Sequence, residues 1–198
     1  MKQIYLATLL TTVASISFAD MATVGNFKGF YAGPLAAYGK ARMGVNNQRY
    51  KKTRLMAGGM IGYGHVFQEK GLYLGNEWAL ISDTFSEKKD DQRLEKIGHL
   101  ETLIRFGEII ENNFLPYAAV GGFYGRYKLK SDTLNRRFHM SGWIGEVGVD
   151  AFVRPNITIR SSIRYQRGLR VYGGKDQIRV QKKPQGVLLK VGISYIFN

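Results

Sequence analysis

Apolar side chains alternate with small or polar side chains in one segment of this chain after another. Successive side chains of a strand point to opposite faces, so this two-residue period predicts β-strands with one apolar face. The last segment shows it most clearly, with an apolar set of Val187, Leu189, Val191, Ile193, Tyr195 and Phe197. Eight such segments, separated by polar or Gly-rich breaks, predict an all-β fold of eight antiparallel strands.

Charged residues fall on the faces opposite the apolar ones. The central parts of the apolar faces carry no Asp, Glu, Lys or Arg, whereas the other faces mix both signs of charge with glycine. Those charges are Glu77, Glu101, Arg105, Arg126, Glu146, Asp150, Arg160, Arg164 and Lys190. They fit either the wet surface of a soluble sandwich or the lumen of a membrane barrel.

Aromatic residues at the ends of the apolar faces favour the barrel, because membrane barrels place aromatic girdles at both interfaces. In the fifth segment, Tyr117, Ala119, Phe123 and Tyr127 are expected on this outer, apolar face. Its lumen face is expected to hold Val120, Gly122, Tyr124 and Arg126.

The connections between segments alternate in length. Residues 41–53, 82–96, 128–138 and 168–185 read as long polar loops, whereas 67–71, 108–114 and 154–156 read as short turns. Outer-membrane barrels have long extracellular loops and short periplasmic turns. The sequence therefore predicts an eight-stranded up-and-down transmembrane barrel with both termini in the periplasm.

The first nineteen residues read as a secretory signal peptide. Lys2 precedes a short uncharged apolar stretch, and Ser17-Phe18-Ala19 has the small-x-small form of a cleavage site. We therefore expect a signal peptide over residues 1–19 and one barrel domain over 20–198. The chain has no cysteine, which excludes disulfides, thiol catalysis and thiolate metal sites.

Several short motifs resemble those of the opacity-protein and OmpA transmembrane-domain type of eight-stranded outer-membrane barrels, also called porin-family proteins. They include Gly29-Phe30-Tyr31-Ala32-Gly33, Tyr73-Leu74-Gly75-Asn76-Glu77 and the closing Gly192-Ile193-Ser194-Tyr195-Ile196-Phe197. The resemblance implies an outer-membrane location and insertion by the barrel-assembly machinery. Such proteins usually end on an aromatic residue, whereas here Asn198 follows Phe197.

The nine charges of the lumen faces are expected to pair with one another, because isolated buried charges are very costly. Eight strands enclose a space that side chains can fill, so we predict a lumen plugged by an ion-pair network. A narrow porin-like diffusion channel is the alternative.

The predicted loops are rich in bases, and loops on a rigid scaffold often bind ligands. The candidate binding residues are Arg42, Arg49, Lys51, Lys52, Arg136, Arg137, Arg170, Lys175, Arg179, Lys182 and Lys183. They suit the phosphates of lipopolysaccharide, other outer-membrane lipids, or an anionic surface or host ligand. Nucleic acid, which a formal net charge of +14 also suggests, is disfavoured by export.

An enzyme is the less favoured class. His139 and Ser141 resemble the H-x-S pair of lipid A deacylases, but the nearest acids, Glu146 and Asp150, are expected on the opposite face. No catalytic, metal or cofactor site is predicted. A periplasmic lipocalin-like barrel is the non-membrane alternative.

Overall fold

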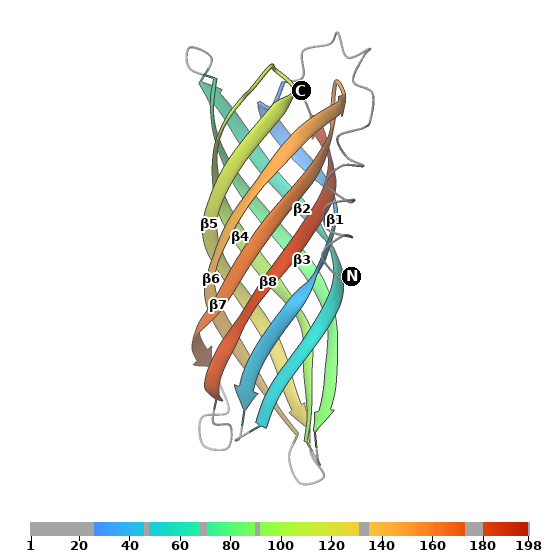
Figure 1. The fold of residues 1–198 in the computed structure, drawn as a ribbon, viewed down its shortest axis with the longest axis vertical. Coiled ribbons are helices and arrows are strands. Elements are labelled where there is room, and N and C mark those ends of the chain that lie inside the picture. Colours follow the sequence, from blue (N-terminus) through green and yellow to red (C-terminus); the bar gives the residue numbers. More distant parts are fainter. Residues whose placement is uncertain are drawn as a thin grey trace, which may run out of the picture.

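The computed structural model describes residues 26–45, 48–67, 71–89, 92–130, 135–172 and 180–197. Its strands are β1 (Gly29–Val45), β2 (Gln48–Phe67), β3 (Leu72–Lys89), β4 (Gln92–Glu108), β5 (Phe114–Lys130), β6 (Asn135–Arg154), β7 (Ile157–Tyr172) and β8 (Val180–Phe197). Each strand pairs with the next in antiparallel register, and β8 pairs with β1 to close the barrel (Figure 1). The predicted eight-stranded up-and-down barrel is confirmed. The predicted signal peptide lies outside the described residues.

The barrel has two different ends. At the turn end, uppermost in Figure 1, residues 68–71, 109–113 and 155–156 connect strands, and β1 begins where β8 finishes. At the loop end, residues 46–47, 90–91, 131–134 and 173–179 connect strands. In the described part of the chain, no helix has the length and apolar character needed to span a membrane.

The loop end differs from the sequence prediction. Most residues of the four predicted long loops continue the strands instead; β1 and β2, for example, stay paired as far as Val45 and Gln48. The polarity of these stretches suggested loops, but inward apolar residues such as Met43, Leu94 and Phe138 alternate with the outward charges. The strands therefore extend well beyond the apolar part of the wall.

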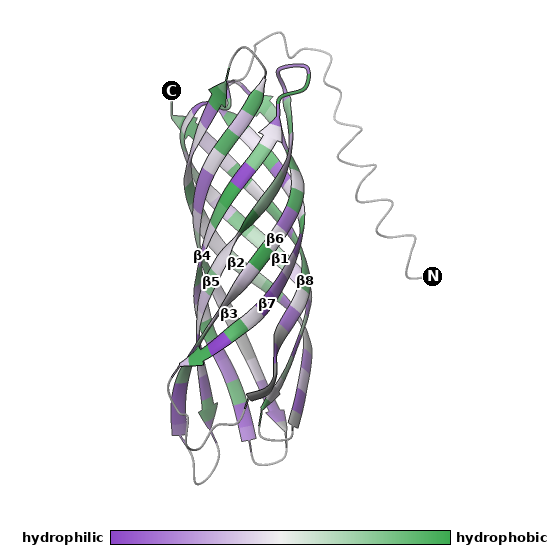
Figure 2. Ribbon diagram, turned by 90° about the vertical axis from the view of Figure 1, so that its left-hand side faces the viewer, coloured by the Kyte–Doolittle hydropathy of each residue, from purple (hydrophilic) through white to green (hydrophobic). Residues whose placement is uncertain are grey.

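The outer wall is apolar around its middle. Leu55, Ile61, Leu80, Val147 and Ile163 are all more than half exposed. Water-soluble monomers rarely expose a continuous apolar surface of this kind. Hydrophilic colours gather at the loop end in Figure 2, as expected where a barrel leaves the bilayer.

Strand β5 faces the opposite way from the prediction. Tyr117, Ala119, Phe123 and Tyr127 are buried, whereas Tyr124 and Arg126 are exposed. Both faces of this strand are apolar and aromatic, so alternation alone does not decide between them. The neighbouring strands do: Ala119 lies opposite Arg105 of β4 and Glu146 of β6, and both of those side chains point inward.

A pair of adjacent glycines tests this orientation. An added Cβ at Gly121 would lie 1.9 Å from the Thr102 carbonyl oxygen, whereas at Gly122 the nearest atom is 3.4 Å away. We expect Gly121→Ala to lower the free energy of unfolding by about 1–3 kcal/mol and Gly122→Ala to change it by less than about 0.5 kcal/mol. Urea titration in lipid vesicles measures both. Equal midpoints for the two variants would contradict the assignment of β5.

Candidate functional site: a charged lumen and a basic outer collar

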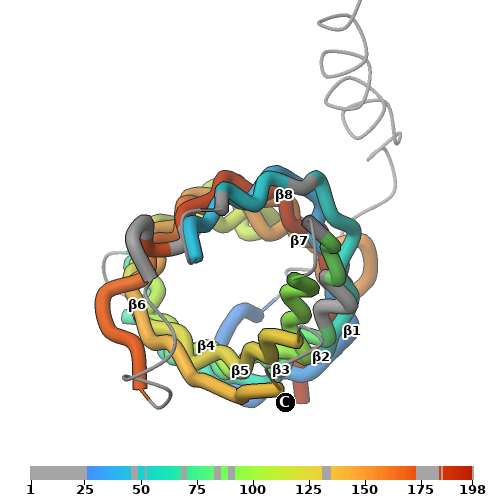
Figure 3. Tube along the Cα trace, turned by 90° about the horizontal axis from the view of Figure 1, so that it is seen from below, coloured from blue at the N-terminus to red at the C-terminus, as the bar shows by residue number. Residues whose placement is uncertain are grey.

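Eight charged side chains meet in the middle of the lumen, none more than 3% exposed. They are Glu77, Glu101, Arg105, Glu146, Asp150, Arg160, Arg164 and Lys190. Figure 3 shows the ring of strands along the barrel axis, and the eight side chains lie inside this ring. All eight belong to the set predicted from the sequence.

Cross-strand register sets two of the contacts in this set, those between facing residues of β6 and β7. Asp150 of β6 lies directly opposite Arg160 of β7, and the Arg160 Nε donates to Asp150 Oδ1 over 2.8 Å. Four residues along, Glu146 lies opposite Arg164, whose Nε donates to Glu146 Oε2 over 2.8 Å. Opposite charges placed in this way stabilise a strand pair.

Longer side chains join these pairs across the lumen. Arg160 also contacts Glu77, and the Lys190 Nζ lies 3.3 Å from Glu77 Oε1 and 3.1 Å from Glu146 Oε1.

The network continues at both of its ends. Arg164 reaches Glu101, and the Arg105 guanidinium donates to Asp150 over 2.7 Å. The eight side chains thus form one connected network of four acids and four bases with no formal net charge.

Uncharged and aromatic partners complete the network, and the sequence reasoning missed them. The Tyr31 hydroxyl donates to Glu77 over 3.0 Å, and the Tyr117 hydroxyl donates to Glu146 over 2.7 Å. The Arg105 guanidinium lies 3.9 Å from the centre of the Tyr117 ring, within range of a cation–π contact. His99 Nε2 lies 2.7 Å from Glu101 Oε1. The sequence signal that could have identified His99 was its spacing from Glu101, because residues two apart on a strand lie on one face.

Apolar layers fill the lumen on either side of the network. Towards the loop end they are Met43, Val45, Tyr50, Leu94, Tyr127, Leu129, Phe138 and Met140. Towards the turn end they are Phe27, Tyr31, Tyr73, Leu115, Phe152 and Ile196. Cavities of 20 Å³ at the loop end and 10 Å³ near Arg105 and Arg160 remain, about the space of a single water molecule.

Arg126 was predicted in the lumen, and that prediction is wrong. Its side chain is exposed on the outer wall, opposite Gly98 of β4 and His139 of β6. The error follows directly from the inverted faces of β5.

Arg126 belongs instead to a group of exposed bases around the loop end, which we call the basic collar. Three collar bases follow an exposed aromatic residue by two positions, namely Lys40 after Tyr38, Arg126 after Tyr124 and Arg167 after Tyr165. The exposed members are Lys40, Arg42, Arg49, Lys51, Lys88, Arg93, Arg126, Arg136, Arg137, Arg167, Arg170 and Lys183. The collar therefore begins where the apolar wall and its aromatic girdle end.

The other basic residues that were predicted to bind ligand fall into two groups. Lys52 and Lys182 lie in β2 and β8, rather than in loops. Lys175 and Arg179 lie outside the described residues.

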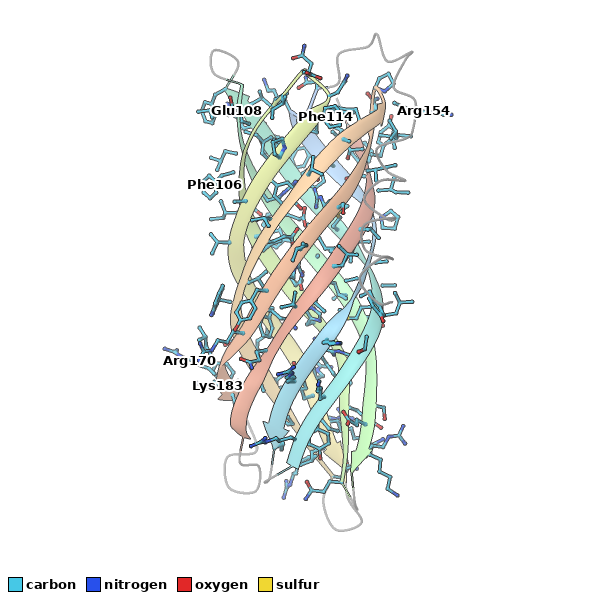
Figure 4. All side chains as sticks on the ribbon, in the orientation of Figure 1. Phe106, Glu108, Phe114, Arg154, Arg170 and Lys183 are labelled. Atoms are coloured by element: carbon cyan, nitrogen blue, oxygen red, sulfur yellow. The ribbon has the colours of Figure 1, made fainter. Side chains whose placement is uncertain are left out.

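Exposed charge differs sharply between the two ends. Among the described residues, the exposed charges of the turn end are Lys28 and Arg154 against Glu108 and Glu111. The loop end exposes bases, while Glu87 and Glu95, its acids whose side chains the structure describes, are only partly exposed. Figure 4 shows Glu108 and Arg154 at the turn end, with Arg170 and Lys183 low on the wall near the loop end. Counting the side chains that the structure describes, the loop end is thus the strongly cationic surface.

His139 and Ser141 face outward, as predicted, and contact tyrosines. The His139 ring stacks on Tyr124 with 5.3 Å between ring centres, and the Ser141 hydroxyl lies 3.4 Å from the Tyr172 hydroxyl. Within the described barrel these two residues make no hydrogen bond to each other, which is the contact that a Ser–His hydrolase needs.

No family model matches the chain. It is 27% identical over 149 residues to the 22 kDa outer membrane protein of Rhizobium leguminosarum bv. viciae, covering 74% of this chain and 67% of that protein. The chain is an eight-stranded outer-membrane β-barrel.

Solved structures share its fold. Neisserial surface protein A has a TM-score of 0.60 at 17% identity, covering 86% of this chain and 98% of that one. Ail, the attachment invasion locus protein of Yersinia pestis, has a TM-score of 0.56 at 13% identity, covering 86% and 99%. A second Ail structure, at 0.55 and 14% over the same shares, contains the heparin analogue sucrose octasulfate. These structures share the fold, and the similarity to the 22 kDa outer membrane protein places the barrel in the outer membrane.

Proposed function

We propose that this barrel binds polyanions at the outer face of the outer membrane through its basic collar. The phosphates of lipopolysaccharide are the first such ligand, and anionic surface polymers are the second. The barrel itself acts as a rigid, plugged scaffold rather than as a diffusion channel.

The position of the collar carries the proposal. Lys40, Arg126 and Arg167 stand two residues beyond girdle aromatics, and girdles mark the level of the lipid headgroups. Arginine pairs with phosphate through two parallel hydrogen bonds, which favours it at such sites. The short periplasmic turns of outer-membrane barrels orient the loop end, and with it the collar, towards the cell exterior.

The filled lumen supports the scaffold role. Four acids and four bases pair in its middle, and apolar layers close it on both sides. An eight-stranded barrel has an interior that side chains can fill completely. The complex of Ail with sucrose octasulfate supports the ligand class, because a barrel of this fold binds a highly sulfated sugar.

A triple collar variant tests the proposal. We expect Arg126→Gln, Arg137→Gln and Arg170→Gln together to weaken binding to lipopolysaccharide and to sucrose octasulfate at least about tenfold, because each change removes one charge-assisted contact. Titration calorimetry on the barrel in nanodiscs measures the affinity.

The matched control is Lys28→Gln with Arg154→Gln, which removes exposed bases from the turn end. This variant should bind as the unchanged protein does. Unaltered binding by the triple variant, or equal losses in both variants, would refute a ligand site at the collar. Dephosphorylated lipopolysaccharide should bind weakly to all three proteins.

A further inference from the structure

A β-bulge changes the direction of the side chains near the loop end of β7. The ladder between β6 and β7 skips Leu169, which is therefore an extra residue in β7. Before the bulge, the even-numbered residues 158–166 are buried in the lumen. Beyond it, the even-numbered Arg170 and Tyr172 are exposed, and Val171 packs against the apolar core of the lumen instead. Bulges commonly re-aim side chains next to functional sites.

The bulge completes a group of six outward side chains on three neighbouring strands, which we call the β5–β7 patch. Cross-strand register arranges them in two rows, each with one residue from β5, β6 and β7. The first row is Arg126, His139 and Tyr172, and the second row is Tyr124, Ser141 and Arg170. Each row spans two strand spacings, or about 10 Å. One sugar ring with an attached phosphate can cover this distance.

Contacts between the two rows hold the middle of the patch together. The His139 ring stacks on Tyr124, and the Ser141 hydroxyl lies 3.4 Å from the Tyr172 hydroxyl. The two arginines of the patch stand at opposite corners, one on β5 and one on β7. Two bases therefore flank a centre of aromatic rings and hydroxyl groups.

An exposed apolar residue lies beside each of these arginines. Leu169 directly precedes Arg170 and is 48% exposed. Ile97, at a register shift of β4, is 51% exposed and precedes Gly98, which lies opposite Arg126. A soluble polymer would leave both apolar side chains in water, whereas the acyl chains of a lipid would cover them, which is favourable. The surroundings of the patch therefore suit a membrane lipid better than a soluble polyanion.

We propose that the β5–β7 patch binds one acylated sugar phosphate of the outer leaflet and recognises its sugar ring as well as its phosphate. The proposal rests on the proposed function of the basic collar and specifies its lipid ligand. Arg126 and Arg170 pair with the phosphate. Tyr124 and Tyr172 are 47% and 43% exposed, and the negative faces of their rings attract the weakly positive C–H groups of a sugar. Ser141 supplies a hydroxyl that can donate to or accept from the sugar hydroxyls.

Two lipids that share a phosphate but differ in the sugar test the proposal. The probes are monophosphoryl lipid A and phosphatidic acid, each titrated into the full barrel in zwitterionic detergent, with native mass spectrometry counting the bound lipid. We expect the unchanged protein to bind monophosphoryl lipid A at least about tenfold more tightly than phosphatidic acid.

The variant Tyr124→Leu with Tyr172→Leu keeps every charge of the collar but removes both ring faces. It should bind monophosphoryl lipid A at least about tenfold more weakly than the unchanged protein, while its affinity for phosphatidic acid should change by less than about threefold. The matched control is Tyr38→Leu with Tyr63→Leu, which removes exposed tyrosines from β1 and β2, across the ring from the patch. This control should bind both lipids as the unchanged protein does.

All variants must first show the gel mobility shift of a folded barrel. Equal affinity of the unchanged protein for the two lipids would overturn the sugar site. Unaltered binding of monophosphoryl lipid A by the Tyr124→Leu, Tyr172→Leu variant would overturn it too, and the collar would still stand if the triple collar variant loses that lipid. Retention of the lipid by the triple collar variant would instead refute the collar itself.

Discussion

Replacing Arg160 with alanine is expected to lower the free energy of unfolding by about 3–5 kcal/mol. The Arg160 guanidinium contacts both Asp150 and Glu77, and all three side chains are buried. Removing it leaves two carboxylates without their shared partner, so the loss includes the desolvation of stranded charges. Urea titration of the barrel in lipid vesicles measures the change.

The control for this substitution is Arg170→Ala, which removes an exposed arginine from the collar. Exposed ion pairs contribute little, and we expect a change of less than about 0.5 kcal/mol. Equal losses for the two variants would show that the lumen network does not hold the barrel together.

Val147→Arg is expected to cost about 2–4 kcal/mol, the price of a charge at the lipid midplane. Val147 is 59% exposed and lies on β6 between Trp143, near the loop end, and Val153, near the turn end. The same change at Leu169, which is 48% exposed beyond the girdle residue Tyr165, should cost no more than about 1 kcal/mol.

Refolding into vesicles followed by urea titration compares the two arginine variants. If water surrounded this wall, neither arginine would lower the free energy of unfolding through contact with lipid. A tolerated Val147→Arg would therefore contradict the assignment of lipid as the solvent of this wall.

Sequence alternation predicted seven of the eight strand orientations because one face of each strand carries the decisive residues. In β7, for example, Arg160 and Arg164 alternate with Ile159 and Ile163, and the bilayer admits only one arrangement. In β5 the two faces carry Tyr117 and Phe123 against Val120 and Tyr124, so neither is excluded from lipid or from the lumen. The register with β4 and β6 decides, and register is not visible in a single sequence.

The sequence could predict which residues belong to the network, but not which acid pairs with which base. Eight of nine proposed members lie in the lumen because buried charges need partners, and their faces were correctly assigned. Which acid meets which base depends on register, as the Asp150–Arg160 and Glu146–Arg164 pairs show. The loop end was misread for another reason: outward charges such as Arg137 hid the alternation with inward Phe138 and Met140.

The most direct test of the proposed function is native mass spectrometry of the barrel extracted in mild detergent from its own outer membrane. We expect lipopolysaccharide or lipid A adducts on the unchanged protein and on the Lys28→Gln, Arg154→Gln control. The Arg126→Gln, Arg137→Gln, Arg170→Gln variant should lose these adducts while keeping its folded charge-state distribution. Adducts that persist on the collar variant, or that are absent from the unchanged protein, would contradict the collar as the site at which this barrel binds its anionic ligand.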